Sequence, residues 1–321
     1  MLGKGQPLAW MRFTVITPCL NREKFIAEAV ESVVAQQYDD VEHWIIDGGS
    51  TDKTLEIVRS YSHLRVLSEP DRGVYDAFNK GLDRATGGAV IFLNSDDLLT
   101  PGTLALAQQI FQNALGTQII SGGCEIFRRT DTGREINMHR YDDPKQNQLN
   151  FRNVTLGFPN INARIFRRSV FDKLGRFNLA YRLASDRDLL MQAALANIPD
   201  APVANILYRY RWHEGSLTMN AGNNSLSQAQ QEGLNIIAGL LASPNITEDQ
   251  RRILGQWRRE CVATDFMIQV LNRRLNHAGR IFWPIFQQDR LIPLTLLRLG
   301  FLAVGRRIRT HYRLYQAEHA A

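Results

Sequence analysis

The sequence lacks the features that mark several large classes of protein. Its 321 residues include only three cysteines, Cys19, Cys124 and Cys261, which are far apart and odd in number. They favour neither a disulfide framework nor a zinc site, so we expect a reducing cytoplasm. The N-terminal MLGKGQPLAW contains no long apolar stretch and indicates no signal peptide. No G-x-G-x-x-G follows the second predicted strand and no G-x-x-x-x-G-K-[ST] occurs, which argues against a nicotinamide cofactor and ordinary kinases or ATPases.

The composition is otherwise that of a globular protein, with 44% hydrophobic and 22% charged residues in 36.5 kDa. The net charge of +6 is unevenly placed. From Ala221 onward the chain carries 13 Lys+Arg and 7 Asp+Glu, whereas the first 220 residues carry 25 of each kind. The basic excess therefore lies in the last third, which favours an anionic surface as a partner of that region.

Short apolar runs alternate with helical patterns in the first hundred residues. We expect strands over residues 12–17, 41–46, 64–67 and 90–93 and helices over 24–37, 54–61 and 74–85. Pro18 should end the first strand. The first helix has an apolar stripe made of Phe25, Ala29, Val30, Val33 and Val34. This alternation predicts an α/β fold with a mostly parallel central sheet and right-handed crossovers.

The rest of the chain is less regular. We expect a helix over 103–115, a strand over 118–127, a turn at 131–133, a strand over 135–140, helices over 169–174 and 186–196, and a strand over 204–212. Residues 141–160 are polar and aperiodic, which predicts a loop bordering the site. The division we expect is a catalytic domain over 1–220 and a basic, partly amphipathic helical region over 221–321, with helices near 225–242, 247–276 and 293–315.

The strand over residues 90–93 ends abruptly in Asn94, Ser95, Asp96 and Asp97. Two adjacent carboxylates at the carboxyl end of a buried parallel strand stand where open α/β sheets bind ligands. Their charges repel unless a proton or a cation relieves them, and Mg²⁺ or Mn²⁺ shared with a phosphate suits the pair. The alternative is a turn followed by a helix N-cap, where aspartate is also common.

Polar residues at two other junctions suit a donor substrate. Asp47 ends the second strand, where a carboxylate can accept hydrogen bonds from a base or ribose. The alternative is a turn aspartate that caps the next helix, a role that Asp52 fits better. Asp76, Asn79 and Lys80 share one face of the third helix, which suits a phosphate or a sugar hydroxyl; the alternative is ordinary exposed residues.

Two residues farther along the chain suit catalysis. Asp186 stands immediately before a helix, as a general base that deprotonates a hydroxyl nucleophile or as an N-cap. His213 follows the strand over 204–212. Together with Asp96 and Asp97 it would complete the coordination of a metal, although a single histidine is more often structural.

Seven segments together carry a family resemblance. In order they are TPCLNRE, IIDGGSTDKT, EPDRGVYDAFNKG, FLNSDD, RRSVFDKLGRF, ASDRDLL and YRWHEGS. This set resembles the bacterial family-2 glycosyltransferases, which have the GT-A fold, and the resemblance runs from about Arg12 to Ser216. It implies an α-linked nucleotide-sugar donor, Mn²⁺ or Mg²⁺, and usually inversion at the anomeric carbon.

The resemblance also implies roles by position. Thr17, Pro18 and Asp47 would line the nucleoside pocket, Asp96 and Asp97 would hold metal and diphosphate, Asp186 would be the catalytic base, and His213 a further metal or diphosphate contact. The full set expected at the donor comprises Thr17, Pro18, Asn21, Glu23, Asp47, Asp71, Asp76, Asn79, Lys80, Asn94, Ser95 and Asp96. Asn94, Ser185 and Asn160 depart from the family's usual aspartate, glutamate and histidine. The absence of Q-x-x-R-W argues against a processive polymerase.

The basic region has an amphipathic part. The apolar run over 291–304 is too short and too charged to span a bilayer. Apolar and aromatic residues beside Arg306, Arg307, Arg309 and Arg313 suit helices that lie in a membrane interface, and the alternative is a helical lid packed on the enzyme. No nucleic-acid-binding module accompanies these arginines, so we expect no nucleic acid as a partner.

We therefore predict a metal-dependent inverting glycosyltransferase that acts on a hydroxyl of a glycan or glycolipid, a lipid-linked acceptor in surface polysaccharide synthesis. The expected location is the cytoplasm, on the inner face of the cell membrane. One alternative is a sugar-nucleotide nucleotidylyltransferase, which should carry a glycine-rich basic phosphate loop that TPCLNREKF is not. The other is a catalytically silent carbohydrate-binding relative, against which the five residues Asp47, Asp96, Asp97, Asp186 and His213 speak together.

Overall fold

The computed structural model describes residues 10–158, 160–213, 215, 225–272 and 291–300, with positions 274, 279, 282, 283, 286, 287 and 289. The chain divides into two compact units. The first comprises residues up to 127, 139–154 and 158–211, and the second comprises 128–138, 155–157 and the residues from 212 onward. Within the described ranges, no helix is long and apolar enough to cross a membrane.

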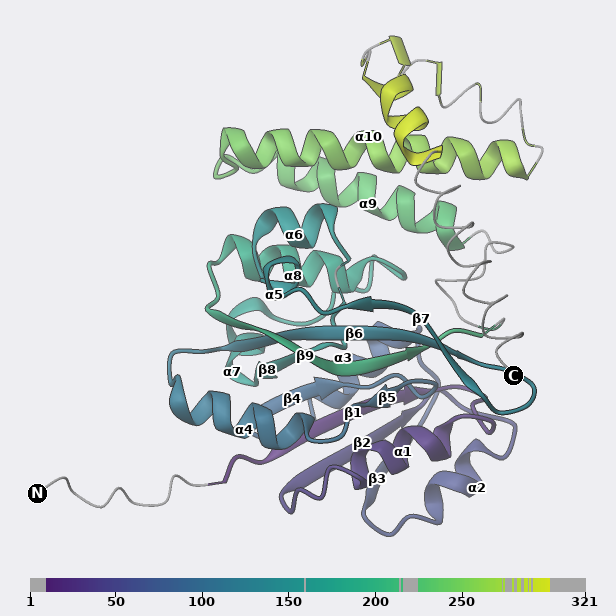
Figure 1. Cartoon of the computed structure of the whole chain (residues 1–321), viewed down its shortest axis with the longest axis vertical. Coiled ribbons are helices and arrows are strands. Elements are labelled where there is room, and N and C mark those ends of the chain that lie inside the picture. The colour runs from purple at the N-terminus through teal and green to yellow at the C-terminus, as the bar shows by residue number, and fades with distance from the viewer. Residues whose placement is uncertain are drawn as a thin grey trace, which may run out of the picture. The chain divides into compact units, whose positions relative to one another are not determined.

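The first unit is built around one sheet whose centre is parallel (Figure 1). β1 (Phe13–Cys19) pairs in parallel with β2 (Val41–Asp47) and β4 (Ala89–Phe92), and β2 with β3 (Leu64–Ser68). β8 (Arg164–Arg167) is antiparallel to β4 and to β6 (Ile119–Arg129); β9 (Asp200–Arg211) is parallel to β6 and antiparallel to β5 (Leu98–Leu99). Among the described residues the order is β3-β2-β1-β4-β8-β6-β9-β5, with β7 (Glu135–Tyr141) paired to β6.

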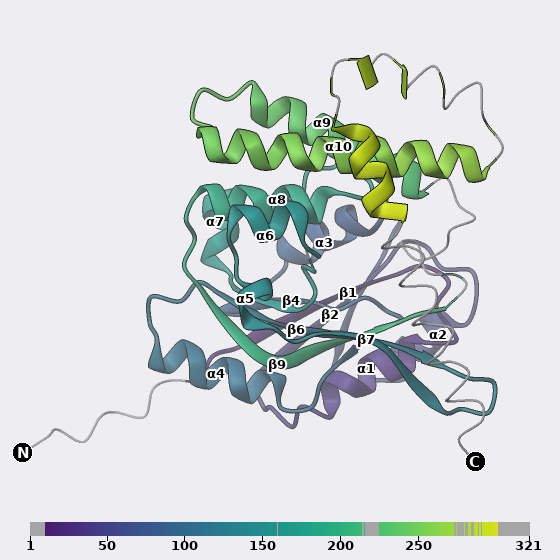
Figure 2. The same ribbon diagram turned by 45° about the horizontal axis from the view of Figure 1, so that its top comes forward.

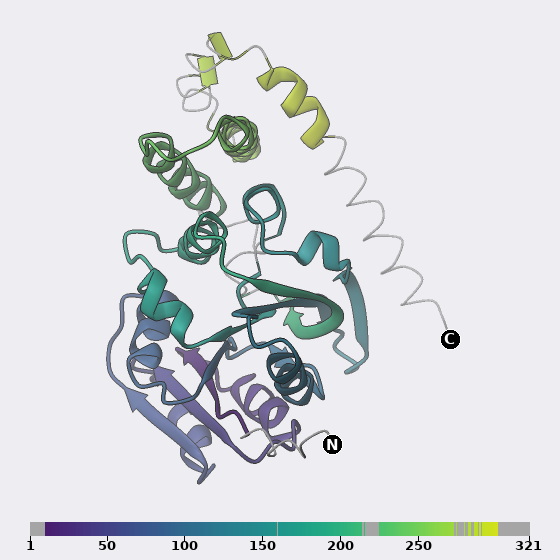
Figure 3. The ribbon, with the colours of Figure 1, turned by 90° about the vertical axis from the view of Figure 1, so that its left-hand side faces the viewer.

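Helices pack on both faces of this sheet (Figure 3). One face carries α1 (Ile26–Val34), α2 (Thr54–Arg59) and α4 (Thr103–Asn113), whose apolar residues join two clusters with alternate residues of β1. The other face carries α3 (Val74–Leu82) and α7 (Ser169–Leu174), with α8 (Ser185–Leu195) packed on α7. On that face Phe78 and Phe171 pack against Phe92, with ring centroids 4.6 and 5.8 Å away.

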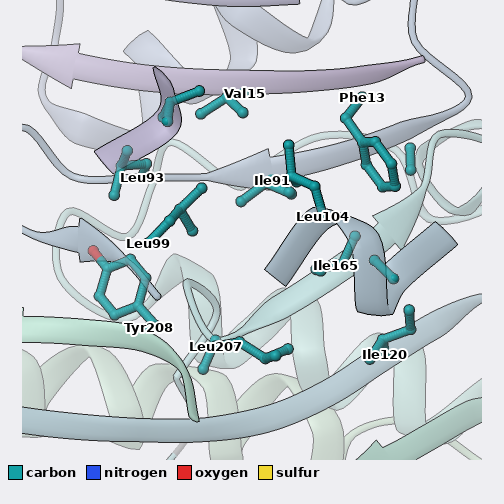
Figure 4. Packing of buried hydrophobic residues seen from close by; sticks show 14 of the residues in the cluster. Phe13, Val15, Ile91, Leu93, Leu99, Leu104, Ile120, Ile165, Leu207 and Tyr208 are labelled. Carbon is teal, nitrogen blue, oxygen red and sulfur yellow. The ribbon is translucent and has the colours of Figure 1, made fainter. Parts of the chain in front are cut away.

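The larger apolar cluster joins elements that are far apart in the sequence. Figure 4 shows Phe13, Ile91 and Leu104 packed with Leu207 and Tyr208 of β9. All five side chains are at most 2% exposed. Because β9 contributes residues to the same core as β1 and β4, the strand that follows α8 is fixed against the parallel part of the sheet.

Two local predictions were wrong. β1 runs through Pro18 to Cys19. The backbone carbonyl of Ile16 faces β4, because it accepts a hydrogen bond from the Leu93 amide. The backbone of Pro18, two residues later, faces the same side of β1, but β4 ends at Phe92 and offers no partner there. The missing N–H of Pro18 therefore removes no hydrogen bond from the ladder. In α1 the buried residues are Ile26, Ala29, Val30 and Val33, whereas Val34 is 48% exposed.

Residues 141–160 were also wrongly predicted as a loop. Two short helices form there, α5 (Pro144–Asn147) and α6 (Phe151–Leu156). The next element, β8, was not predicted. Asp143 caps α5 by accepting a hydrogen bond from the Lys145 amide at 2.9 Å. Elements this short contain too few residues to show a helical or strand period.

The second unit contains the antiparallel helices α9 (Ser225–Leu241) and α10 (Glu248–Leu271), which lie side by side in Figure 2. Thr247 begins α10 with a capping box closed by Gln250. The buried carboxylate of Asp265 accepts hydrogen bonds from Ser227, at 2.5 Å, and Gln231, at 2.7 Å. Residues 292–300 are helical, and the remainder of the helix predicted near 293–315 lies outside the described residues.

Candidate functional site

The parallel strands end together at one edge of the sheet. Cys19 is in register with Asp47, Asp47 with Ser68, and Ile16 with Phe92. The loops after β1, β2, β3 and β4 therefore leave the sheet on the same side, which is where open α/β sheets bind ligands. Half of the twelve residues predicted to contact a donor lie in these four loops, namely Asn21, Glu23, Asp71, Asn94, Ser95 and Asp96.

Reciprocal hydrogen bonds join the loop after β1 to the loop after β2. Asn21 Oδ1 accepts from the Thr51 amide at 2.8 Å, and Glu23 Oε2 accepts from the Lys53 amide at 3.1 Å. In return, Asp52 Oδ2 accepts from the Glu23 amide at 3.1 Å. Asn21 and Glu23 thus hold the two loops together, and their contact with a donor stays a prediction.

Asp47 is fully buried and organises the turn that follows it. Its carboxylate accepts hydrogen bonds from the Gly49 amide at 3.1 Å, from the Ser50 amide and hydroxyl, and from the Ser68 hydroxyl at 2.7 Å. Burial would raise the pKa of Asp47, but these donors outweigh it and leave the pKa below its ordinary value. The carboxylate of Asp47 is therefore ionised and accepts hydrogen bonds from the turn that follows it, as expected for a turn aspartate.

Gly48 makes room for the carboxylate of Asp71. A Cβ at position 48 would lie 2.6 Å from Asp71 Oδ2, too close for any side chain. Asp71 Oδ1 accepts a hydrogen bond from the Gly73 amide at 2.8 Å, which fixes the start of α3. The loop after β3 is thereby held directly against the loop after β2, and Asp71 keeps a partly exposed side chain.

The side chain of Thr17 faces the core, and its predicted place in a nucleoside pocket stays a prediction. Thr17 is 0% exposed, and its hydroxyl lies 2.9 Å from Nε2 of the buried His43. Burial lowers the pKa of His43 to about 3, so this ring is neutral and belongs to the core. Pro18 is buried as well. The exposed part of this segment starts at Leu20, which is 48% exposed.

Asp76, Asn79 and Lys80 do share a helical face, and protein groups contact each of them. Asp76 pairs with Arg72 at 3.0 Å and lies 3.9 Å from Lys80 Nζ, which in turn pairs with Glu69 at 2.9 Å. Asn79 donates to the carbonyl and accepts from the amide of one residue, Phe177, both at 2.9 Å. These contacts join α3 to its neighbours, and the proposed donor contacts stay predictions.

Asp97 is 1% exposed, and three groups hold its carboxylate. Oδ2 accepts a hydrogen bond from the Tyr208 hydroxyl at 2.5 Å and one from Asn94 Nδ2 at 3.2 Å, while Oδ1 accepts from the Arg211 amide at 2.7 Å. Burial, together with the neighbouring charge of Asp96, raises the pKa of Asp97 to about 8. The expected repulsion within the pair is therefore a real feature of the site.

Asp96 remains the more exposed member of the pair, with 17% of its side chain open to solvent. Its carboxylate lies 3.9 Å from Arg22 Nε, and its backbone carbonyl accepts from Arg211 Nε at 2.8 Å. The buried Arg211 also pairs with Glu28 of α1 at 3.0 Å. The turn over residues 94–97, which includes the buried Ser95, is thus fixed to β9 and α1 while Asp96 reaches the surface.

Asp186 lies in the first turn of α8 and contacts α3. Its Oδ1 accepts hydrogen bonds from the Tyr75 hydroxyl at 3.0 Å and the Arg187 amide at 2.7 Å. Tyr75 stacks on Phe177 with ring centroids 5.4 Å apart. Burial raises the pKa of Asp186 above its ordinary value, although both hydrogen bonds oppose the rise. A carboxylate with a raised pKa suits proton abstraction from a hydroxyl better than an ordinary one does.

His213 belongs to the second unit, where its Nδ1 accepts a hydrogen bond from the Gly215 amide at 3.1 Å. Its contact with a metal stays a prediction. Among the residues that the structure describes, no three or more His, Cys, Asp or Glu side chains are grouped so that they could hold a metal ion.

Sequence reasoning missed three supporting residues, Tyr75, Tyr208 and Arg211. One signal was present for Tyr208: a tyrosine within a core strand must bury its hydroxyl against a partner. The sequence YRYRWH shows the strand, but nothing in it identifies Asp97 as that partner.

Comparisons with known proteins agree with this geometry. The model of Glycosyl transferase family 2 matches residues 14–175. The chain is 32% identical over 184 residues to a PGL/p-HBAD biosynthesis glycosyltransferase of Mycobacterium bovis (strain BCG / Pasteur 1173P2), a match covering 55% of this chain and 67% of that protein. It is 25% identical over 217 residues to the uncharacterized glycosyltransferase EpsJ of Bacillus subtilis (strain 168), covering 64% and 62%.

Two solved structures have a similar fold. S. aureus TarS 1-349 in complex with UDP-GlcNAc has a TM-score of 0.58 at 24% identity, covering 80% of this chain and 73% of that one. The mannosyltransferase PcManGT from Pyrobaculum calidifontis, in complex with GDP-Man and Mn²⁺, has a TM-score of 0.59 at 18% identity, covering 96% and 85%. The predicted GT-A type of α/β fold is confirmed.

Proposed function

The chain belongs to glycosyl transferase family 2, and we propose that it transfers a sugar from a nucleotide-diphosphate donor to a hydroxyl acceptor, with a divalent metal ion and inversion at the anomeric carbon. The family makes it a glycosyltransferase, which removes the nucleotidylyltransferase alternative. The donor class and the metal are supported by the UDP-GlcNAc held by TarS and the GDP-Man and Mn²⁺ held by PcManGT.

The observation that carries the proposal is the anchored carboxylate pair at the edge of the sheet. Asp97 is held from three sides and positions the turn, and its direct contact with a metal stays a prediction. Asp96 points its partly exposed carboxylate outward beside Arg22. A carboxylate and a nearby guanidinium suit, respectively, a hard cation and the diphosphate that shares it.

The ligands available at this site suit Mn²⁺ or Mg²⁺. Asp96 would hold Mn²⁺ or Mg²⁺, with diphosphate oxygens and water as the other ligands, because such ions prefer oxygen ligands and usually keep several waters. When bound, the ion neutralises charge that builds on the leaving diphosphate. Burial and the charge of Asp96 raise the pKa of Asp97. A cation bound beside the pair would relieve the repulsion between the two carboxylates.

Asp186 would act as the base. The acceptor oxygen forms a bond to the anomeric carbon as the bond from that carbon to the diphosphate breaks, and the acceptor's proton passes to Asp186. Tyr75 holds Asp186 in a fixed orientation, and α3, which carries Tyr75, begins directly after one of the loops at the site. A single displacement of this kind inverts the anomeric centre and needs no covalent intermediate.

Two variants test the proposal on the full chain. We expect UDP, GDP or dTDP to raise the melting temperature in the presence of Mn²⁺, and Asp96→Asn to abolish that response. Asp186→Asn should keep the nucleotide response and lose sugar transfer. The control is Asp83→Asn, an aspartate 60% exposed and paired with Arg176. Unimpaired transfer by Asp186→Asn would remove Asp186 from the base role, and a lack of any nucleotide response would favour a catalytically silent relative.

A lipid-linked acceptor would place the enzyme at the inner face of the membrane. The surface that supports this part of the proposal is apolar: Leu291, Leu294 and Leu297 are 51%, 62% and 61% exposed, and Trp283 is 61% exposed. Leu294 and Leu297 lie three residues apart on one side of the helix over residues 292–300, and Leu291 directly precedes this helix. Exposed leucines on a helix that also carries Arg298 suit a membrane interface.

A further inference from the structure

Three aromatic side chains gather where β7 ends. The rings of Tyr141 and Phe158 stack with centroids 4.6 Å apart and planes 12° from parallel, and the His139 ring packs edge-on against Tyr141 at 4.3 Å. Phe158 is 42% exposed, and His139 is exposed as well. Contiguous exposed aromatic surface, unlike a single exposed apolar residue, is typical of a binding surface.

The chain before Phe158 is tied to the candidate base. The carbonyl of Val154 accepts a hydrogen bond from Arg187 Nη1 at 3.2 Å, and Arg187 directly follows Asp186. The position of this segment is therefore coupled to the first turn of α8.

The chain after Phe158 is tied to the carboxylate pair. Asn162 Nδ2 donates to the carbonyl of Phe92 at 3.1 Å, at the end of β4 and just ahead of the turn over 94–97. Asn160 Oδ1 accepts from the amides of Asn162 and Ala163, which holds this stretch in a tight turn. Phe158 thus lies between Val154, which is bonded to the neighbour of Asp186, and Asn162, which is bonded to the end of β4.

The charged neighbours of Tyr141 leave the rings as one apolar side of the chain. Side chains alternate between the two sides of a strand, so Arg140 of β7 points away from His139 and Tyr141. Arg140 pairs instead with Asp142 at 3.5 Å and lies 3.9 Å from Glu125 of β6. An apolar wall lined by aromatic side chains is a usual part of a site for a small molecule.

We propose that His139, Tyr141 and Phe158 form a platform on which a pyranose ring of the acceptor stacks. This inference rests on the proposed function, because it names the acceptor that the transferase would use as a carbohydrate. The C–H groups on one face of a pyranose ring carry partial positive charge, and the face of an aromatic ring is negative.

Saturation-transfer NMR on the full chain tests the platform. The probes are the methyl glycosides of glucose, mannose, galactose, rhamnose and N-acetylglucosamine. We expect at least one to receive saturation at its ring protons, and Phe158→Ala to weaken that binding on the order of fivefold. Phe158→Tyr should retain it because the ring remains. The control is Trp10→Ala, a 71% exposed ring that also packs edge-on against a tyrosine, Tyr38.

The outcomes separate this proposal from the function beneath it. Loss of glycoside binding in Phe158→Ala, with an unchanged nucleotide response, supports both. The same loss without any nucleotide response in the wild type keeps the platform and removes the proposed function. Two results overturn the platform: Phe158→Ala binds the glycosides as strongly as the wild type does, or the wild type binds none of them. A variant that only lowers the melting temperature, with glycoside binding unchanged, would show that the stacked rings stabilise the fold and do not bind sugar.

Discussion

The hydroxyl of Tyr208 offers the sharpest test of how the site is built. Tyr208→Phe removes one oxygen and leaves the ring that packs in the core. Asp97 loses its hydrogen bond of 2.5 Å, and the Asn94 amide loses its contact with the same oxygen at 3.3 Å. Burial and the adjacent carboxylate raise the pKa of Tyr208 well above its ordinary value, so the hydroxyl keeps its proton and remains the donor.

The size of the effect follows from the burial of Asp97. At pH 9, above the Asp97 pKa of about 8, the carboxylate is charged, and a hydrogen bond to a charged group contributes about 1.5–3 kcal/mol. The partly buried Asn94 amide, left without its acceptor, costs about 1 kcal/mol more. We therefore expect Tyr208→Phe to lower the free energy of unfolding by about 2–4 kcal/mol. For a cooperative unit of this size that is a fall in melting temperature of roughly 5–10 °C.

The assay is urea unfolding of the full chain, with Tyr38→Phe as the matched control. The Tyr38 hydroxyl donates to Met11 O and lies within hydrogen-bond distance of Gln108 Oε1, each at 3.0 Å, and neither partner is charged. We expect its loss to cost about 1 kcal/mol. A double-mutant cycle with Asp97→Asn should give a coupling energy of about 1–2 kcal/mol between positions 208 and 97.

Two results would contradict the expected role of the Tyr208 hydroxyl. One is that Tyr208→Phe destabilises the protein no more than Tyr38→Phe, and the other is that the double-mutant cycle shows no coupling between positions 208 and 97. Either result would mean that the hydroxyl does not hold Asp97 in solution. The claim that Asp97 anchors the turn would then have no support.

Three further predictions address the base, the packing of α3 and the apolar helix. Tyr75→Phe removes a hydrogen bond that lowers the pKa of Asp186, so this pKa should rise further and the acid limb of the pH–rate profile should move to higher pH. Because activity is lost as pH falls through that pKa, the variant should lose activity on the acid side of the profile and change little on the alkaline side. Gly81→Ala places a Cβ 2.3 Å from Ile16 Cγ2 and should cost about 1–3 kcal/mol in urea unfolding, whereas Gly239→Ala, with nothing within 4 Å, should be neutral or stabilising. Leu294→Glu with Leu297→Glu should abolish sedimentation with phosphatidylcholine–phosphatidylglycerol vesicles, whereas Leu115→Glu, at a residue 73% exposed in the first unit, should not.

Each of the three has an outcome that contradicts it. An unchanged acid limb would mean that Asp186 is not the group whose ionisation limits the rate. Gly81→Ala as stable as Gly239→Ala would mean that α3 can move away from β1. Vesicle binding that survives both glutamates would favour the lid over the membrane-facing role for this helix.

The parallel half of the fold was predictable because β1 and β4 are fully buried and β2 is mostly buried. These strands are rich in apolar residues, and each is followed by a polar loop. β8 was missed because its four residues, RIFR, begin and end in arginine. Its buried Arg164 is bonded to Ser121 and Asn147, partners that no local pattern identifies.

The candidate site was predictable to the extent that its residues follow strands. Asp96, Asp97 and Asp186 were found from their positions at the ends of elements. The different roles of the two adjacent aspartates could not be found, because they depend on Tyr208 and Arg211, which are 111 and 114 positions away. The contact of Thr17 with His43 could not be found either, because His43 lies on the neighbouring strand.

The long separations in the sequence have a consequence for biosynthesis. Asp97 is held by Tyr208, and Asp186 pairs with Tyr75, in each case across 111 residues of sequence. A nascent or prematurely terminated chain that stops before β9 would therefore contain the glycine turns and the acidic pair Asp96 and Asp97, but would lack Tyr208, which holds Asp97 in place. Loop-closure entropy delays such distant contacts during folding. A fragment of that kind should bind nucleotide poorly even if its parallel strands assemble, because Asp96 and Asp97 would be left to repel each other.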